Sequence, residues 1–155
     1  MIDPIIIHTH AEFPDFLNST TPVLSCGLTL NQIIAKDVKP YLIDPSHVFA
    51  TERSTLPTDL MFRGAWHVAD WSNPKVTHDI TKAKTIGHTE RRKLRDKEFA
   101  PHDDVIAKNI PGTDLVAAEA ARAVIRQKYA TIQTQIDAAT DTNEIRMALN
   151  LPLTT

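Results

Sequence analysis

The chain has 155 residues, of which 42% are apolar and 23% are charged. This length excludes two full catalytic domains, and this composition lets one domain bury a core without a metal or a disulfide. The formal net charge of −2 and a pI near 6.4 provide no overall field that would attract nucleic acid or an anionic membrane, so neither is an expected partner.

The N-terminus has an apolar run of only three isoleucines, Ile5–Ile7, and no basic segment before it. A signal peptide is therefore not expected, and no later stretch is long and apolar enough to predict a membrane span. The single cysteine, Cys26, has no partner for an internal disulfide and no cationic neighbours that would activate its thiol. We expect Cys26 to be a buried, small apolar residue.

Prolines divide the first half of the chain into short segments that cannot form long helices. They are Pro4, Pro14, Pro22, Pro40, Pro45, Pro57 and Pro74. Apolar and β-branched residues predict minimal strands at Ile5–Ile7, Val23–Ser25 and Tyr41–Ile43. Thr29 is a suitable N-cap for a short helix that Pro40 would end. The apolar face of this helix would contain Leu30, Ile33, Ile34 and Val38.

The segment 62–78 alternates large apolar and polar residues around a central Ser-Asn-Pro turn. This pattern predicts a β-hairpin. Trp66 and Val68 would share one face with Phe62, because side chains alternate along a strand. We expect that face to pack on Ile5–Ile7, with the Trp66 strand in the same sheet.

From Asp79 onward the chain becomes rich in Ala, Arg, Lys and Glu, which predicts long helices. Asp79 is a suitable N-cap for a helix that runs to about Phe99. A second helical stretch would begin at Pro101, with Asp103 and Asp104 in its first turn, where carboxylates favour the helix dipole.

Residues 110–112, Ile-Pro-Gly, predict a break, after which Thr113 would cap a helix from Asp114 to about Ala139. At 1.5 Å per residue this helix would be roughly 39 Å long. One narrow apolar stripe follows its whole length and predicts packing against another helix. The stripe contains Ala118, Ala121, Ile125, Tyr129, Ile132, Ile136 and Ala139.

The first turns of this helix are apolar on the opposite side as well. A helix that is apolar on two sides must be covered on both, and the rest of the chain offers little to cover the second side. We therefore expect self-association or a permanent protein partner there. The candidate interface residues are Leu115, Val116, Ala120, Ala123 and Val124. A capping box at residues 141–144 predicts a last short helix.

Together these segments predict an α+β fold with two domains. Residues 1–78 would form a small mixed α/β domain, and residues 79–155 a helical hairpin with a short terminal helix. The hairpin's first helix has a thin seam and a basic cluster that contains Arg91, Arg92, Lys93, Arg95 and Lys97. We interpret the cluster as a solvated face with local ion pairs, because it has no interleaved aromatic residues of the kind that bind nucleic acid.

The sequence offers little that would support catalysis. His8 and His10 alternate as metal ligands on a strand do, but no third ligand is adjacent, and we expect no functional metal site. The glycines stand singly, which argues against a phosphate-binding loop. We find no nucleophile elbow or Cys/His arrangement. We therefore predict no catalytic residue, no cofactor and no enzymatic activity.

Several segments, in order, resemble a group of small bacteriophage proteins that are usually encoded beside tail-fibre genes. They are CGLTLNQIIAKDV (26–38), LPTD (56–59), FRGAW (62–66), DITKAK (79–84), EFAPHDD (98–104) and IPGT (110–113). Some members of this group are described as tail assembly chaperones. The resemblance extends over nearly everything after about residue 24, and it carries over no catalytic residue.

The resemblance implies a tail-associated protein that assembles in the bacterial host cytoplasm and whose partners are other tail or fibre proteins. The first hypothesis is a subunit that stays in the virion tail as a structural or fibre-attachment protein and forms a homo-oligomer. The alternative is a transient tail or tail-fibre assembly chaperone. A small metal-dependent enzyme is a third hypothesis, which only the His8 and His10 pair favours.

Overall fold

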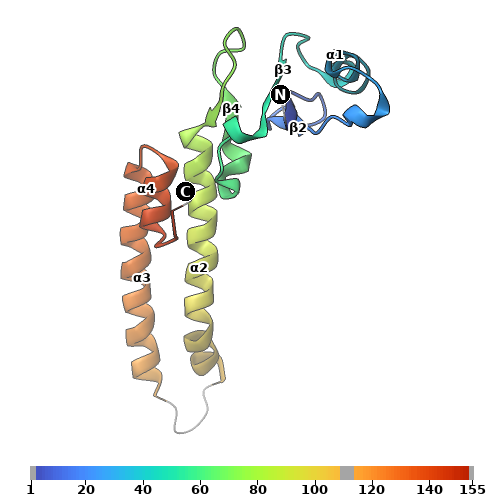
Figure 1. The fold of residues 1–155 in the computed structure, drawn as a ribbon. Helices are drawn as coiled ribbons and strands as arrows, with labels where there is room; N and C mark the ends of the chain where they lie inside the picture. Colours follow the sequence, from blue (N-terminus) through green and yellow to red (C-terminus); the bar gives the residue numbers. More distant parts are fainter. Residues whose placement is uncertain (1–2, 109–113, 154–155) are drawn as a thin grey trace. The chain divides into compact units, whose positions relative to one another are not determined.

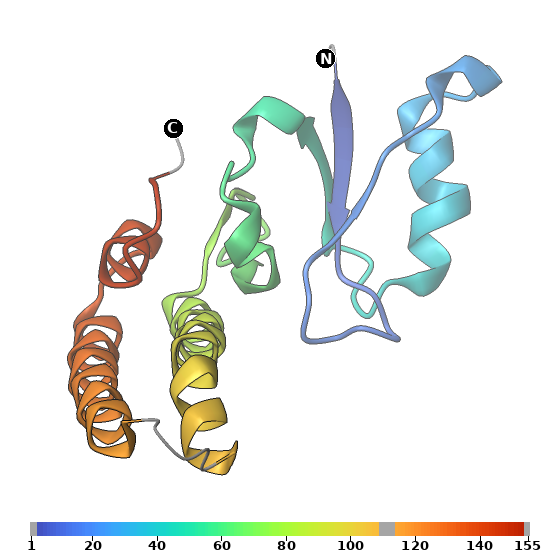
Figure 2. The ribbon, with the colours of Figure 1, turned by 90° about the horizontal axis from the view of Figure 1, so that it is seen from below.

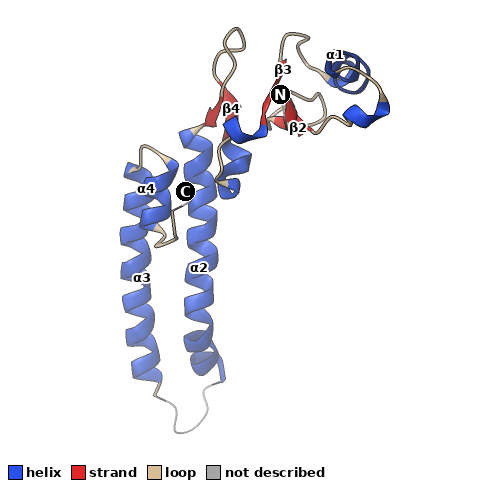
Figure 3. Ribbon diagram, in the orientation of Figure 1, coloured by secondary structure: helices blue, strands red, loops and turns tan. Residues whose placement is uncertain are grey.

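The computed structural model describes residues 3–108 and 114–153. The chain divides into two compact units, an N-terminal unit (Met1–Asp79) and a C-terminal unit (Ile80–Thr155). All strands of the described residues lie in the N-terminal unit, and the long helices lie in the C-terminal unit (Figure 3). The predicted α+β fold class is thus confirmed, and the division falls one residue after the predicted boundary.

The N-terminal unit is built around the strand β1 (Pro4–His8). This strand lies at the centre of a three-stranded antiparallel sheet, between β2 (Asn18–Thr20) and β3 (Val48–Glu52). Its three isoleucines are almost completely buried, because both faces of the sheet are covered. That explains why β1 is a continuous β-branched run and lacks the alternation of a half-exposed strand.

One face of the sheet packs on a short helical segment. Ile6 forms a cluster with Ile33 and Val38, which belong to α1 (Leu30–Ile33) and to the wider π-helical turn that continues it (Ile34–Val38). The segment lies beside β1 in Figure 2. As predicted, Thr29 is the N-cap: its side chain accepts the Gln32 N–H, and the Gln32 side chain accepts the Thr29 N–H.

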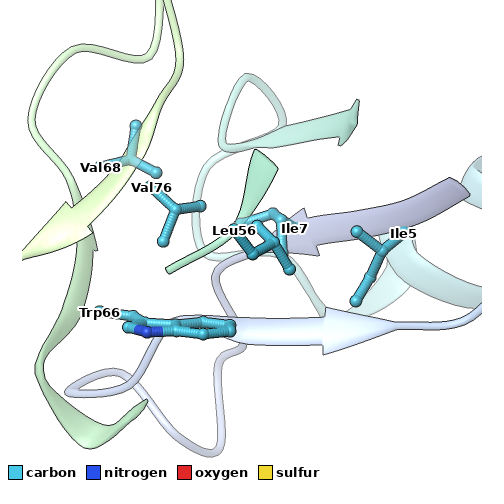
Figure 4. Packing of buried hydrophobic residues seen from close by; sticks show 6 residues of the cluster. All are labelled: Ile5, Ile7, Leu56, Trp66, Val68 and Val76. Atoms are coloured by element: carbon cyan, nitrogen blue, oxygen red, sulfur yellow. The ribbon is translucent and has the colours of Figure 1, made fainter. Parts of the chain in front are cut away.

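The other face of the sheet packs on a β-hairpin. Its strands β4 (Trp66–Val68) and β5 (Val76–His78) pair antiparallel. The buried cluster on this side contains Ile5, Ile7, Leu56, Trp66, Val68 and Val76 (Figure 4). The hairpin and its packing on the Ile5–Ile7 strand are confirmed. The predicted common sheet is wrong, because β4 and β5 form a separate two-stranded sheet that contributes side chains, and no ladder bonds, to this core.

The residues before Trp66 are helical, which corrects the predicted strand there. Phe62 belongs to a 3-10 segment (Leu60–Ala65). The Asp59 side chain caps this segment by accepting the Met61 N–H at 3.1 Å. The Phe62 side chain is buried although the residue lies in this 3-10 segment. Its burial is therefore not explained by the alternation of side chains along a strand.

The predicted strands at Val23–Ser25 and Tyr41–Ile43 are also wrong. These regions contain the short 3-10 turns Leu24–Cys26 and Lys39–Tyr41, and a third such turn spans Arg53–Thr55. Every residue of these turns is exposed, and none of them pairs in either of the described sheets. Cys26 is exposed within the first of them, so the expectation that it would be buried is wrong.

The C-terminal unit is a hairpin of the long helices α2 (Ile80–Lys108) and α3 (Leu115–Ala138), with α4 (Thr142–Ala148) packed against both. Figure 1 shows α2 and α3 running antiparallel. The capping box predicted at residues 141–144 is present in part: the Asp141 side chain accepts the Glu144 N–H at 2.9 Å, while Glu144 accepts the N–H of Thr140.

The hairpin's first helix is longer than predicted. α2 continues through Pro101, which lies inside it, so the two predicted helical stretches are one. Asp103 and Asp104 are therefore not in a first turn; they pair with Arg122 and Lys108. The predicted break at residues 110–112 and the predicted Thr113 cap lie outside the described residues. Asp114 is the N-cap of α3.

Small residues let the helices of this unit approach closely. Ala83 and Gly87 of α2 are buried. A Cβ atom added to Gly87 would lie only 2.6 Å from Cγ2 of Ile145 in α4 and 3.5 Å from Cγ2 of Ile136 in α3. Glycine at this position is therefore what allows α2, α3 and α4 to meet.

Candidate protein interface

The five predicted interface residues lie in the first ten residues of α3. Asp114 starts this helix by accepting the Ala117 N–H with its side chain at 2.9 Å. Half of these ten residues are alanine, which has the strongest intrinsic preference for a helix. The cap and the alanines therefore favour a helix here, even though only one side of it packs on the rest of the unit.

The inner side of α3 follows the predicted stripe. Ala118, Ile125, Tyr129, Ile136 and Ala139 are buried. Polar groups also hold α3 to α2. Glu98 of α2 accepts a hydrogen bond from Lys128 at 2.6 Å and from the Tyr129 hydroxyl at 2.9 Å. This stripe therefore supplies the core of the C-terminal unit.

The outer side of α3 carries the α3 strip, which we define as Val116, Ala120, Ala123 and Val124. At about 100° per residue these four lie on the side opposite Ala118 and Ile125. Val116 is 81% exposed and Val124 is 70% exposed, and both alanines are exposed too. Leu115, rotated by about 100° from Val116, borders the strip and is 37% exposed.

The borders of the strip are polar. Glu119, on one side, pairs with Arg122 at 2.6 Å and with Arg126 at 3.4 Å. Beyond Val124 the same side of the helix continues with the exposed polar residues Gln127, Thr131 and Thr134. The apolar surface therefore ends after about 12 Å, the rise of eight helical residues.

A shallow apolar groove lies next to this region. It has a volume of about 470 Å³ and lies between the last turns of α2 and the first turns of α3. Its lining residues are His102, Val105, Asp114, Ala117, Ala118 and Ala121. The described residues of α2 thus leave part of the predicted inner stripe, around Ala121, only partly covered.

Sequence reasoning missed Arg91, which was assigned to a solvated basic face. Arg91 is buried and donates from Nη1 to the Tyr129 carbonyl at 3.2 Å. It follows Ala83 and Gly87 at intervals of four residues, so it continues their seam. This four-residue spacing is the sequence pattern that could have predicted the burial of Arg91. Lys93 and Arg95 of the same cluster do form the expected local ion pairs, with Glu90 and Asp96.

His8 and His10 do not form a ligand pair on one strand, because β1 ends at His8. The His8 ring is buried and bonded on both nitrogens, to the Thr9 carbonyl at 2.8 Å and the Thr20 hydroxyl at 3.0 Å. His10 instead stacks on Tyr41, with ring centroids 5.3 Å apart. Within residues 3–108 and 114–153, no group of three or more His, Cys, Asp or Glu side chains is arranged to hold a metal ion.

Two further findings bear on function. None of the described helices is long and apolar enough to cross a membrane. No protein-family model matches the chain, and neither does any curated protein or solved structure.

Proposed function

We propose that this chain is a bacteriophage tail-associated structural or fibre-attachment protein that acts by binding other proteins, and that it self-associates through the α3 strip. The exposed α3 strip is the observation that carries the proposal. Two valines that are more than two-thirds exposed, separated by exposed alanines, form an apolar surface that its own unit leaves in water.

A second copy of the chain fits this surface for two reasons. Small residues such as Ala120 and Ala123 allow two helices to approach closely, so that a strip of this kind can pack against an identical strip across a two-fold axis. The formal net charge of only −2 means that two copies repel each other weakly. Glu119 and Arg126, which border the strip, supply both signs of charge to a symmetric contact.

The assignment to a phage tail is supported by the ordered sequence segments that resemble proteins encoded near tail-fibre genes. Four of those segments contribute core residues: Ile33 and Val38 lie in 26–38, Leu56 in 56–59, Phe62 and Trp66 in 62–66, and Ala83 in 79–84. In this proposal the chain assembles in the host cytoplasm and stays in the tail region of the virion. Its other partners are tail or fibre proteins.

Mass spectrometry of purified particles tests the tail assignment. A structural subunit should be present at a fixed ratio to the other tail proteins in every preparation. Its absence from finished particles, together with its presence in complexes from infected cells, would contradict the structural role and favour the transient assembly chaperone. A matched measurement on tail-less particles should lose the chain together with the tail proteins.

A further inference from the structure

A pocket between the middle parts of α2 and α3 is lined by four arginines. It has a volume of about 410 Å³, which lies within the roughly 300–1,000 Å³ range of small-ligand sites. Arg91 and Arg95 reach it from α2, and Arg122 and Arg126 reach it from α3. Phe99, Tyr129, Ala130 and Gln133 complete the described lining, in which there is no carboxylate.

Among the described residues, Arg91 is within ion-pair distance of no carboxylate, and Asp137 acts on its charge only from further away. The residue is only 9% exposed, and its Nη1 atom donates to the Tyr129 carbonyl at 3.2 Å. Its Nε atom is buried and has no hydrogen-bond partner among the described residues. Burial is the largest of the effects that lower its pKa, followed by the nearby charges of Arg95 and Arg92, while the charge of Asp137 raises it. A guanidinium nevertheless stays charged in proteins, and a buried charge without an anion is costly.

The other three arginines have carboxylate partners, but these lie outside the pocket. Arg95 pairs with Asp96, Arg122 with Asp103 and Glu119, and Arg126 with Glu119. Among the described residues, three of the four guanidinium groups are therefore in ion pairs, and Arg91 is in none. Five hydrogen bonds from these groups are formed within the described residues, whereas four guanidinium groups offer about twenty N–H donors.

Two of the guanidinium groups are held in place by an aromatic ring. The Arg95 and Arg122 guanidinium carbons lie 5.9 Å and 5.7 Å from the centroid of the Phe99 ring. Stacking of this kind fixes the orientation of the planar group and leaves its edge free to donate. The pocket thus presents oriented donors from two helices.

We propose that this pocket binds a small oxyanion of the phosphate class. A tetrahedral phosphate has oxygens on all sides and carries one to two negative charges. It can therefore accept hydrogen bonds from guanidinium groups of α2 and of α3 at the same time. A carboxylate is planar, has two oxygens and matches one guanidinium fork. Bound phosphate would supply an anion in direct contact with Arg91 and would link the two helices.

Inorganic phosphate is the probe for this site. In the full-length protein at constant ionic strength, we expect saturable shifts of the Nε–Hε signals of the lining arginines in heteronuclear NMR spectra. Arg126→Gln should weaken phosphate binding about tenfold, as expected for the loss of a charge-assisted hydrogen bond. Arg126 is half-exposed, so this variant should fold. Arg91→Gln should weaken binding further, with circular dichroism reporting whether it folds.

Arg92→Gln is the matched control, because Arg92 is an exposed neighbour that does not line the pocket. It removes the same charge and should change the affinity less than about twofold. Shifts that grow linearly without saturation would overturn the proposal, as would equal effects of Arg126→Gln and Arg92→Gln. Acetate that binds as tightly as phosphate would overturn the assignment to the phosphate class.

Discussion

Trp66 is the largest side chain in the core that joins the central sheet to the β4–β5 hairpin, and it is 3% exposed. Its indole packs in the cluster with Ile5 and Ile7 (Figure 4), and the Arg63 guanidinium lies 4.8 Å from the centre of its ring. Trp66 is the buried aromatic residue of this cluster, and the partly buried Phe49 and Trp71 pack against it.

Trp66→Ala should destabilise the N-terminal unit by about 3–5 kcal/mol, because it opens a large cavity in this core. Urea denaturation followed by tryptophan fluorescence measures the change, because each single variant keeps one of the chain's two tryptophans. Trp71→Ala, at a partly buried position that stacks on His47, is the matched control and should cost less. An unchanged urea midpoint for Trp66→Ala would contradict the placement of Trp66 in the core.

His8 and His78 make the N-terminal unit sensitive to acid. Burial lowers the pKa of both residues below the usual 6.5. The unfolded chain therefore binds more protons than the folded one just below pH 6.5, so protonation favours unfolding. The stability is fully present above the unfolded pKa and is lost as the pH falls from 6.5 toward the lowered pKa values.

The urea midpoint of the N-terminal unit should accordingly fall between about pH 7.5 and pH 5, a window in which histidine titrates. His8→Gln should make this fall smaller, because one of the two groups no longer titrates. A midpoint that is constant or higher at the acidic end would show that the two rings are not buried as neutral groups.

Side-chain patterns at single residues predicted several local features correctly. The Thr29 cap, the Ile33 and Val38 face and the packing of Trp66 on Ile5–Ile7 are all present. Cys26 and Arg91 were placed wrongly, because the position of one residue relative to a core depends on the packing of the whole unit. An arginine in a basic run gives no sign of burial unless the i, i+4 seam is followed through it.

At the scale of elements, helices were predicted better than strands. Helical periodicity persists over α3 because one side of a long helix packs on the unit. The edge strands β2 and β3 were missed: every described residue of both is half-buried, so neither shows the alternation that identifies a strand. The β2 sequence, Asn-Ser-Thr, also has little intrinsic β preference at its first position.

Pro101 is the clearest conflict between local preference and the observed element. Proline inside a helix removes a backbone hydrogen bond and clashes with the carbonyl four residues earlier, here that of Lys97. Continuous packing along α2 overrides this preference, since Arg91, Glu98 and Asp103 on both sides of the proline's turn all contact α3. α2 therefore carries a local cost that its tertiary contacts offset.

Pro101→Ala should stabilise the C-terminal unit, by up to about 3 kcal/mol, because the exposed alanine restores the N–H and relieves the clash. Thermal unfolding followed by circular dichroism at the helical band measures it. Ala100→Gly is the control and should cost about 1 kcal/mol if this turn is helical. A lower melting temperature for Pro101→Ala would mean that packing against α3 requires the proline's geometry.

At the scale of the whole molecule, the change in composition at Asp79 predicted where strands give way to long helices. The arrangement within each unit could not be predicted in the same way. Nothing in the sequence distinguishes one mixed sheet from two sheets that share a core, because the same residues, Ile7 and Trp66, are buried in both arrangements. The sequence did indicate that the first turns of α3 are apolar on two sides, and the second of these sides, the α3 strip, is exposed.

The central claim is that the α3 strip is an interface between copies of the chain. The most direct test is light scattering during size-exclusion chromatography of Ala120→Glu/Val124→Glu, which places two charges in the contact without touching the buried stripe. Thr131→Glu/Thr134→Glu adds the same charges on the polar continuation of that side and serves as the control. We predict that the wild type and the control have the mass of an oligomer, and that the strip variant is a folded monomer. A strip variant with the same mass as the wild type would contradict the account.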